Sequence, residues 1–141
     1  MYEKLLVAVD HSEITGRVID AARELAHLAG GEVWLLHVLE LAAPGKYAGP
    51  AMASNETRVE EQGTVDAMAG EFTKAGIKAQ GELRHTVFGY AAREIVEDAK
   101  IHDVDAIVMG SRGHSNLASL VLGSTAHKVI HLTDRPVLVV R

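Results

Sequence analysis

Apolar and polar positions along the chain fall into blocks typical of strands and helices that follow one another. Continuous apolar runs at 4–9, 33–39 and 105–109 predict short strands buried on both faces. Partial alternation over 77–85 predicts an outer strand, and VLVV at 137–140 predicts a last one. The chain therefore carries the pattern of five strands.

Between these runs, apolar residues at helical spacing predict helices over about 14–29, 88–102 and 116–132. A polar helix, weakened by Gly63 and Gly70, is predicted over about 56–75. Counted along the chain, the third helix is expected to bury Phe88 in its apolar face, and the fourth to bury Leu132. The segment 41–55 is rich in proline, glycine and alanine. Because it is long for a strand-to-helix connection, we expect a lid or a disordered loop there.

Strict alternation of strands and helices predicts an α/β fold, in which a parallel sheet has helices on both faces and right-handed crossovers. No internal repeat, low-complexity tract or interdomain linker interrupts the pattern. The sequence therefore predicts one domain over residues 1–141.

Composition limits the function more than the fold. The net charge of −5 argues against a dedicated nucleic-acid binder, and the lack of cysteine excludes disulfides, thiolate catalysis and zinc–cysteine sites. The first residues lack the pattern of a signal peptide, and no apolar stretch approaches the length of about 18 residues that spans a membrane. We expect a cytoplasmic protein with no nucleic-acid or membrane partner.

Ligands of open α/β sheets bind beyond the carboxyl ends of the strands, where the strand order reverses. If the order is the common 3-2-1-4-5, the first and fourth strands flank that point. Asp10, which follows the first strand, would then face the glycine-rich segment that follows the fourth. Asp10 and Ser12 also suit a helix cap, and capping is compatible with ligand contact for Asp10.

The glycine-rich segment reads GSRG at 110–113 and GST at 123–125. Glycine allows close backbone approach, successive N–H groups can bind an anion, and Arg112 can pair with phosphate. The spacing is neither a P-loop nor GxGxxG. A tight turn and close helix packing would explain the same glycines, so a phosphate site and a packing role both remain open.

The pattern Gly110-x2-Gly113-x9-Gly123-Ser124 is similar to the ATP-binding signature of the universal stress protein family. VMGSRGHSNL at 108–117, PVLVV at 136–140 and LLVAVDHSE at 5–13 extend the resemblance along the chain. It implies a Rossmann-like, five-stranded open parallel sheet of order 3-2-1-4-5. It also implies a homodimer that pairs through the last strand, 137–140.

The resemblance further implies an ATP site with particular roles. Asp10, with Ala8 and Val9 beside it, would line the adenosine end, and the backbone of Val38 would meet adenine. Met109 and Gly110 would lie along the ribose and α-phosphate. The phosphates would be held by Arg112, Gly113, His114, Gly123, Ser124 and Thr125.

We therefore expect ATP to act as a regulatory ligand, with Mg²⁺ entering, if at all, together with the nucleotide. We expect no catalytic residues and no dedicated metal site among the eight histidines, and strand alternation would turn His37 away from the site. Two alternatives stay open: a slow Mg²⁺-dependent ATPase or nucleotide phosphohydrolase, and an interaction module that binds no nucleotide.

Overall fold

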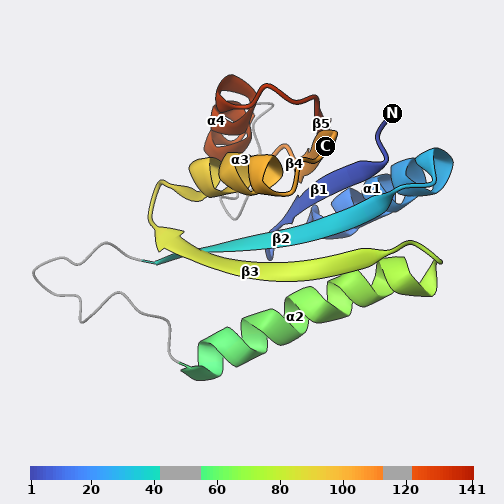
Figure 1. Cartoon of the computed structure of the whole chain (residues 1–141). Coiled ribbons are helices and arrows are strands. Elements are labelled where there is room, and N and C mark those ends of the chain that lie inside the picture. Colours follow the sequence, from blue (N-terminus) through green and yellow to red (C-terminus); the bar gives the residue numbers. More distant parts are fainter. Residues whose placement is uncertain (42–54, 113–121) are drawn as a thin grey trace, which may run out of the picture.

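The computed structural model describes residues 1–41, 55–112 and 122–141, in which strands and helices alternate (Figure 1). All neighbouring strands are parallel, in the order β3-β2-β1-β4-β5. The predicted α/β fold and strand order are confirmed. The elements are β1 (Lys4–Val9), α1 (Thr15–Ala29), β2 (Glu32–Leu41), α2 (Asn55–Lys74), β3 (Ala79–Val87), α3 (Ala91–Ile101), β4 (Ala106–Gly110), α4 (Ser124–Leu132) and β5 (Val137–Val140).

Helices cover both faces of the sheet, α1 and α2 on one and α3 and α4 on the other (Figure 1). Successive side chains of a strand point to opposite faces, so each strand feeds two cores. In β1, Leu5 and Val7 join the core under α1 and α2, whereas Leu6 joins the core under α3 and α4. Burial on both faces explains why this strand reads as a continuous apolar run.

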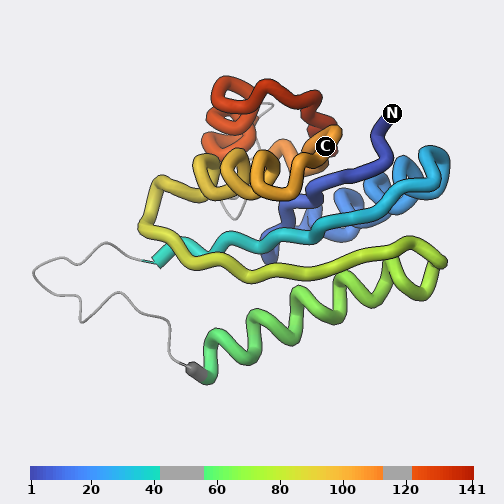
Figure 2. Tube along the Cα trace, in the orientation of Figure 1, coloured from blue at the N-terminus to red at the C-terminus, as the bar shows by residue number. Residues whose placement is uncertain are grey.

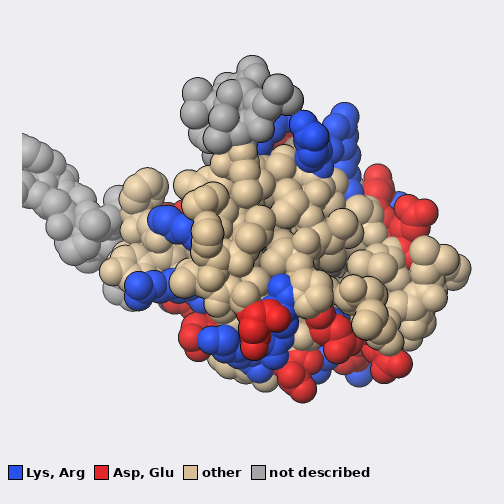
Figure 3. Space-filling model, turned by 90° about the horizontal axis from the view of Figure 1, so that it is seen from above, with Lys and Arg blue, Asp and Glu red and all other residues tan. Residues whose placement is uncertain are grey.

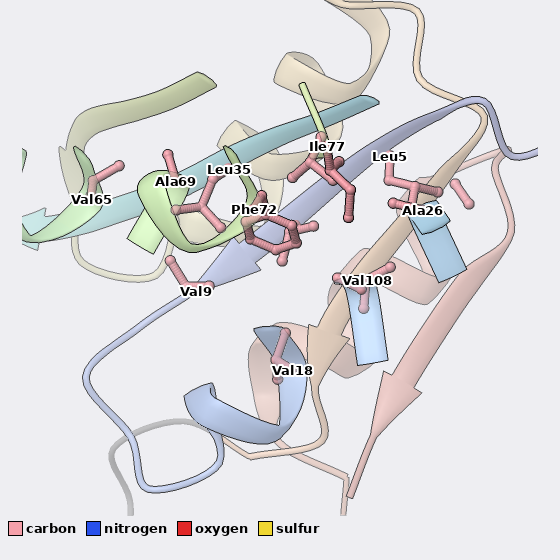
Figure 4. Close-up of a cluster of buried hydrophobic side chains, with 14 of the residues drawn as sticks. Leu5, Val9, Val18, Ala26, Leu35, Val65, Ala69, Phe72, Ile77 and Val108 are labelled. Carbon is pink, nitrogen blue, oxygen red and sulfur yellow. The ribbon is translucent and has the colours of Figure 1, made fainter. Parts of the chain in front are cut away.

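The long helix α2 is held to the sheet by a narrow stripe of side chains. It runs back along β3 and packs on β3 and β2 (Figure 2). Val65, Ala69 and Phe72 recur at helical spacing and are buried, with Phe72 at the centre of the cluster (Figure 4). Most of the remaining helix surface is polar, so these few residues must supply most of its burial energy.

A polar cluster is buried between α3 and the sheet. Asp98 is fully buried, and the indole Nε1 of Trp34 donates a hydrogen bond to its Oδ2 at 2.9 Å. Nη2 of Arg84 lies 2.7 Å from Oδ1, although the contact does not have hydrogen-bond geometry. Burial raises the pKa of Asp98, and the charge of Glu82 adds to this, against the lowering by Trp34 and Arg84. The cluster ties α3 to β2 and β3.

Two predicted helix starts are wrong. The third helix begins at Ala91 and not at Phe88, because Gly89 takes a left-handed conformation with φ of 88°. Phe88 is 76% exposed and does not belong to a helical core face. The fourth helix begins at Ser124: Leu122 and Gly123 precede it in non-helical conformation, and 116–121 lie outside the described residues.

Other predictions are wrong by smaller amounts. Leu132 ends α4 and is half exposed, so it is not the buried residue expected. β3 runs two residues later than predicted, and β2 continues to Leu41, the first residue of the expected loop. The predicted loop itself falls on 42–54, outside the described residues, and Asn55 begins α2. None of the helices in the described ranges combines the length and apolar character that crossing a bilayer requires.

Candidate functional site

A cavity of about 460 Å³ lies at the carboxyl ends of β1, β2 and β4. This is where the strand order reverses, because the chain leaves β1 toward β2 on one side and later places β4 on the other. Its volume is in the range of small-molecule sites. Ten of the twelve predicted site residues line it, and these are Ala8, Val9, Asp10, Val38, Met109, Gly110, Arg112, Gly123, Ser124 and Thr125. Gly113 and His114, the other two, lie outside the described residues.

Asp10 orders the turn between β1 and α1. Its Oδ1 accepts hydrogen bonds from the backbone N–H of Ser12 at 2.9 Å and from the hydroxyl of Thr15 at 3.0 Å. The residue before α1 is Ile14, and no side chain caps the helix there. The predicted capping role of Asp10 and Ser12 is therefore wrong. Asp10 instead fixes the turn that holds it in the cavity wall.

Gly110 and Gly123 let two chain segments approach closely. A Cβ on Gly123 would stand 3.0 Å from the carbonyl oxygen of Ser111 and 3.3 Å from Cα of Arg112. A Cβ on Gly110 would stand 3.1 Å from the side chain of Ile14. Neither glycine has a positive φ. The packing interpretation thus accounts for both glycines, and the close approach they allow forms this wall of the cavity.

The N-terminus of α4 opens into the same wall. The N–H of Gly123, the residue before the helix, donates to the carbonyl of Ser111 at 2.6 Å and joins the two segments. Ser124, Thr125 and Ala126 form the first turn, where backbone N–H groups have no partner within the helix. No acidic side chain lies in that turn. All three residues line the cavity, so the positive end of the helix dipole and two hydroxyls face it.

Sequence reasoning missed several lining residues. Phe88 follows the carboxyl end of β3 and lines the cavity with an exposed ring. The Oε2 of Glu40 accepts a hydrogen bond from the backbone N–H of Gly89, which fixes the turn that carries Phe88. The sequence does contain a signal for Phe88, namely its position just beyond a parallel strand, where residues are the first candidates for a site. Because Phe88 also fits the helical pattern over 88–102, it was assigned to the buried face of a helix.

A second group of residues, which we call the histidine–glutamate cluster, is formed by His11, His37 and Glu61. Nε2 of His11 lies 2.6 Å from Oε2 of Glu61, and Nε2 of His37 lies 3.5 Å from the same oxygen. His11 and His37 also line the cavity, so the expectation that His37 points away is wrong. Beside the cluster, burial lowers the pKa of His85, and the charges of Arg58 and His37 add to this effect.

Two other arrangements of titratable side chains lie away from the cavity. Glu82, Asp98 and His102 form a compact group at α3, already engaged by Trp34 and Arg84. His127 and His131 lie one turn apart on α4 with ring centroids 4.5 Å apart. This is a helical spacing that suits metal ligands, and the expectation of no metal site overlooked it.

The sheet order, the cavity at its reversal and the helix N-terminus in the wall define a Rossmann-like α/β domain with a candidate anion-binding site. Comparison with known proteins agrees with this class of fold and identifies the family within it. The universal stress protein family matches residues 1–141, and the chain belongs to that family.

Relatives cover the whole chain. Universal stress protein YxiE of Bacillus subtilis is 35% identical over 154 residues, which cover 100% of both chains. Universal stress protein MJ0577 of Methanocaldococcus jannaschii is 30% identical over 158 residues, covering 100% of this chain and 96% of that one. The solved structure of the universal stress protein from Archaeoglobus fulgidus in complex with dAMP is 27% identical. It has a TM-score of 0.74 and covers 99% of this chain and 98% of that one.

Proposed function

We propose that this protein binds an adenine nucleotide, ATP foremost, in the cavity at the carboxyl ends of the strands. The observation that carries the proposal is the convergence of β1, β2, β4 and the start of α4 on one cavity. Residues more than a hundred positions apart, such as Asp10 and Ser124, line it together. A related protein is known in complex with dAMP, which supports an adenine nucleotide as the ligand.

The phosphates occupy the α4 side of the cavity in this proposal. Backbone N–H groups of the first helical turn and the hydroxyls of Ser124 and Thr125 donate to phosphate oxygens, and Arg112 adds a charge. Mg²⁺ would enter with the phosphates, since it needs only one or two carboxylates besides them. Asp10 and Glu40 are the carboxylates of the described lining.

The nucleoside occupies the opposite side, where Ala8, Val9, Asp10 and Val38 line the cavity. We expect Phe88 to stack on the base, because its side chain lines the cavity and is exposed. Phe88→Ala is then expected to cost about 1–3 kcal/mol of binding free energy, as base–aromatic stacking does. Isothermal titration with ATP measures it, and Tyr90→Ala, another exposed aromatic of the same turn, serves as the control. Equal affinity of Phe88→Ala and wild type would place the base elsewhere.

ATP acts as a regulatory ligand in this proposal, and the cytoplasm, where ATP is abundant, is the proposed location.

The first test is to denature the purified protein, identify any released nucleotide and titrate ATP against the stripped protein. Release of ADP with Mg²⁺ present separates binding from catalysis. Turnover of about 1 per second or more, the ordinary enzyme range, would favour the ATPase alternative. No bound nucleotide and no uptake would favour the interaction module.

We also propose a homodimer that pairs through β5. β5 is one of the two edge strands of the described sheet, and its Leu138 is an exposed apolar residue. Ile130 and Leu132, on the preceding helix α4, are exposed apolar residues as well. Figure 3 shows the face that α3 and α4 cover, where uncharged side chains predominate. An open apolar edge of this kind favours pairing with another chain.

The backbone of β5 suggests a selective test of the dimer. The carbonyls of Pro136 and Val140 accept hydrogen bonds from β4 and the residue after it, so Val139, which alternates with them, presents its N–H to the outer edge. Val139→Pro removes that donor while keeping the bonds to β4. We expect a dimer for wild type and a monomer for Val139→Pro in sedimentation equilibrium, with unchanged circular dichroism. A Val139→Pro protein that stays dimeric would exclude pairing through this edge.

A further inference from the structure

The histidine–glutamate cluster brings together three side chains from separate parts of the chain. His11 lies in the turn after β1, His37 in β2, and Glu61 on α2. One ligand atom from each residue lies within 4.8 Å of the other two. Val65, one turn beyond Glu61 on α2, is buried in the core and fixes the helix at this point. The grouping therefore depends on how α2 packs on the sheet.

His37 is oriented as a metal ligand would be. Its side chain is nearly buried, with 5% of the residue exposed, and its Nδ1 lies 2.9 Å from the carbonyl oxygen of Val9. A carbonyl oxygen only accepts, so Nδ1 carries the proton and Nε2 of the neutral ring presents a lone pair. A backbone carbonyl is one of the usual partners of the far ring nitrogen in a metal-bound histidine, together with carboxylates and water.

The lone pair of His37 has no hydrogen-bond partner in the described part of the chain. Nε2 is buried and faces Oε2 of Glu61 at 3.5 Å. A carboxylate oxygen is also an acceptor, so two electron-rich atoms face each other, and the same Oε2 is hydrogen-bonded to Nε2 of His11. A cation between the two acceptors, either a proton or a metal ion, would remove this unfavourable contact and satisfy the buried lone pair of His37.

Two imidazoles and one carboxylate form a set that suits Zn²⁺ and related divalent transition ions. Bonds of about 2.0–2.1 Å in a tetrahedron place neighbouring ligand atoms about 3.3 Å apart. To reach this spacing, the distance of 2.6 Å between His11 Nε2 and Glu61 Oε2 must increase slightly. The largest distance between two of the three ligand atoms, which is at most 4.8 Å, must decrease. His11 lies on a turn and is partly exposed, which permits the adjustment.

We propose that His11, His37 and Glu61 bind one divalent transition-metal ion, of which Zn²⁺ is the probe. His11 and His37 border the cavity, so the fourth position of the ion opens toward it. This site is distinct from Mg²⁺ that enters with a nucleotide, because its ligands are protein side chains and it needs no phosphate.

The test measures Zn²⁺ binding to chelator-stripped full-length protein, by isothermal titration with ZnCl₂ in the absence of nucleotide. Glu61→Gln and His37→Gln should each weaken the affinity by more than about 100-fold, since losing even a supporting partner of a ligand costs 10–100-fold. His131→Gln is the matched control, because it removes a histidine of the other pair, on α4, and should leave this affinity unchanged.

A second measurement identifies the ligands independently of affinity. Co²⁺ bound to this cluster should give the visible absorption bands of a four-coordinate ion, and His37→Gln should abolish them, with circular dichroism confirming that each variant is folded. Absence of Zn²⁺ binding by wild type would mean that a proton alone bridges the cluster, and would overturn the proposal. Zn²⁺ binding that survives in both Glu61→Gln and His37→Gln would overturn it too. Neither outcome depends on whether the protein binds ATP.

Discussion

Gly123→Val should weaken ATP binding by about 100-fold or more. The variant misaligns the first turn of α4 and so loses hydrogen bonds from this turn to the phosphates. Two charge-assisted hydrogen bonds to phosphate are together worth about 3 kcal/mol or more, which corresponds to about 100-fold in affinity. The structural reason is that a Cβ at position 123 meets the backbone of Ser111 and Arg112 at 3.0 and 3.3 Å. Backbone atoms on both sides cannot give way without moving the helix N-terminus, so the N–H groups would no longer converge on the cavity.

The matched control is Gly70→Val. Gly70 lies on α2 and does not line the cavity proposed to bind ATP, and a Cβ added to it would meet no heavy atom within 4 Å outside the backbone of its own helix. We expect Gly70→Val to bind ATP as wild type does. Gly123→Ala should show an intermediate loss, and urea unfolding of each variant separates binding from overpacking, which costs about 1–3 kcal/mol. Unchanged affinity in a folded Gly123→Val protein would refute a phosphate site at this helix.

Phe72→Ala should lower the free energy of unfolding by about 3–5 kcal/mol, as other deletions of a fully buried phenylalanine do. Phe72 is fully buried in the core formed by α1, α2 and the sheet (Figure 4). The other buried residues of α2, Val65 and Ala69, are smaller and cannot replace it. Because a domain of this kind has about 5–15 kcal/mol of stability in total, the loss is a large share of it.

Urea unfolding followed by circular dichroism measures this effect. Val59→Ala serves as the control, since Val59 lies on the same helix and is 74% exposed, and its removal should change stability by less than about 0.5 kcal/mol. A cost below about 1 kcal/mol for Phe72→Ala would mean that α2 is not anchored through this ring. Since Glu61 lies on α2, the same variant should also weaken Zn²⁺ binding.

Much of the fold could be predicted because a strand that is buried on both faces has a continuous apolar sequence. The runs at 4–9 and 105–109 are apolar almost throughout, as parallel strands between two helical layers must be. Helix starts were harder to predict. Phe88 fits a helical period, but Gly89 and the hydrogen bond from its N–H to Glu40 delay the helix to Ala91. Glu40 lies 49 positions away, so no local pattern contains that contact.

Part of the site could also be predicted, since parallel strands end at the same edge of a sheet. Asp10, Gly110 and Ser124 were expected together, and they line one cavity. The sequence left two explanations of the glycines open, a phosphate site and a tight turn with close packing. Gly110 and Gly123 are not used for a positive φ but for close approach between segments, which only the packed backbone shows.

The sequence by itself determined the alternation of strands and helices, the parallel sheet and the edge at which a ligand would bind, because periodicity and the position of strand ends are local properties. The tertiary structure alone decided that His37 faces His11 and Glu61, and that Phe88 is exposed at the cavity. The three members of the histidine–glutamate cluster are 24 to 50 positions apart, by subtraction of their numbers. Their meeting follows from the packing of α2 across the sheet, through Val65 and Phe72, and no spacing along the chain encodes it.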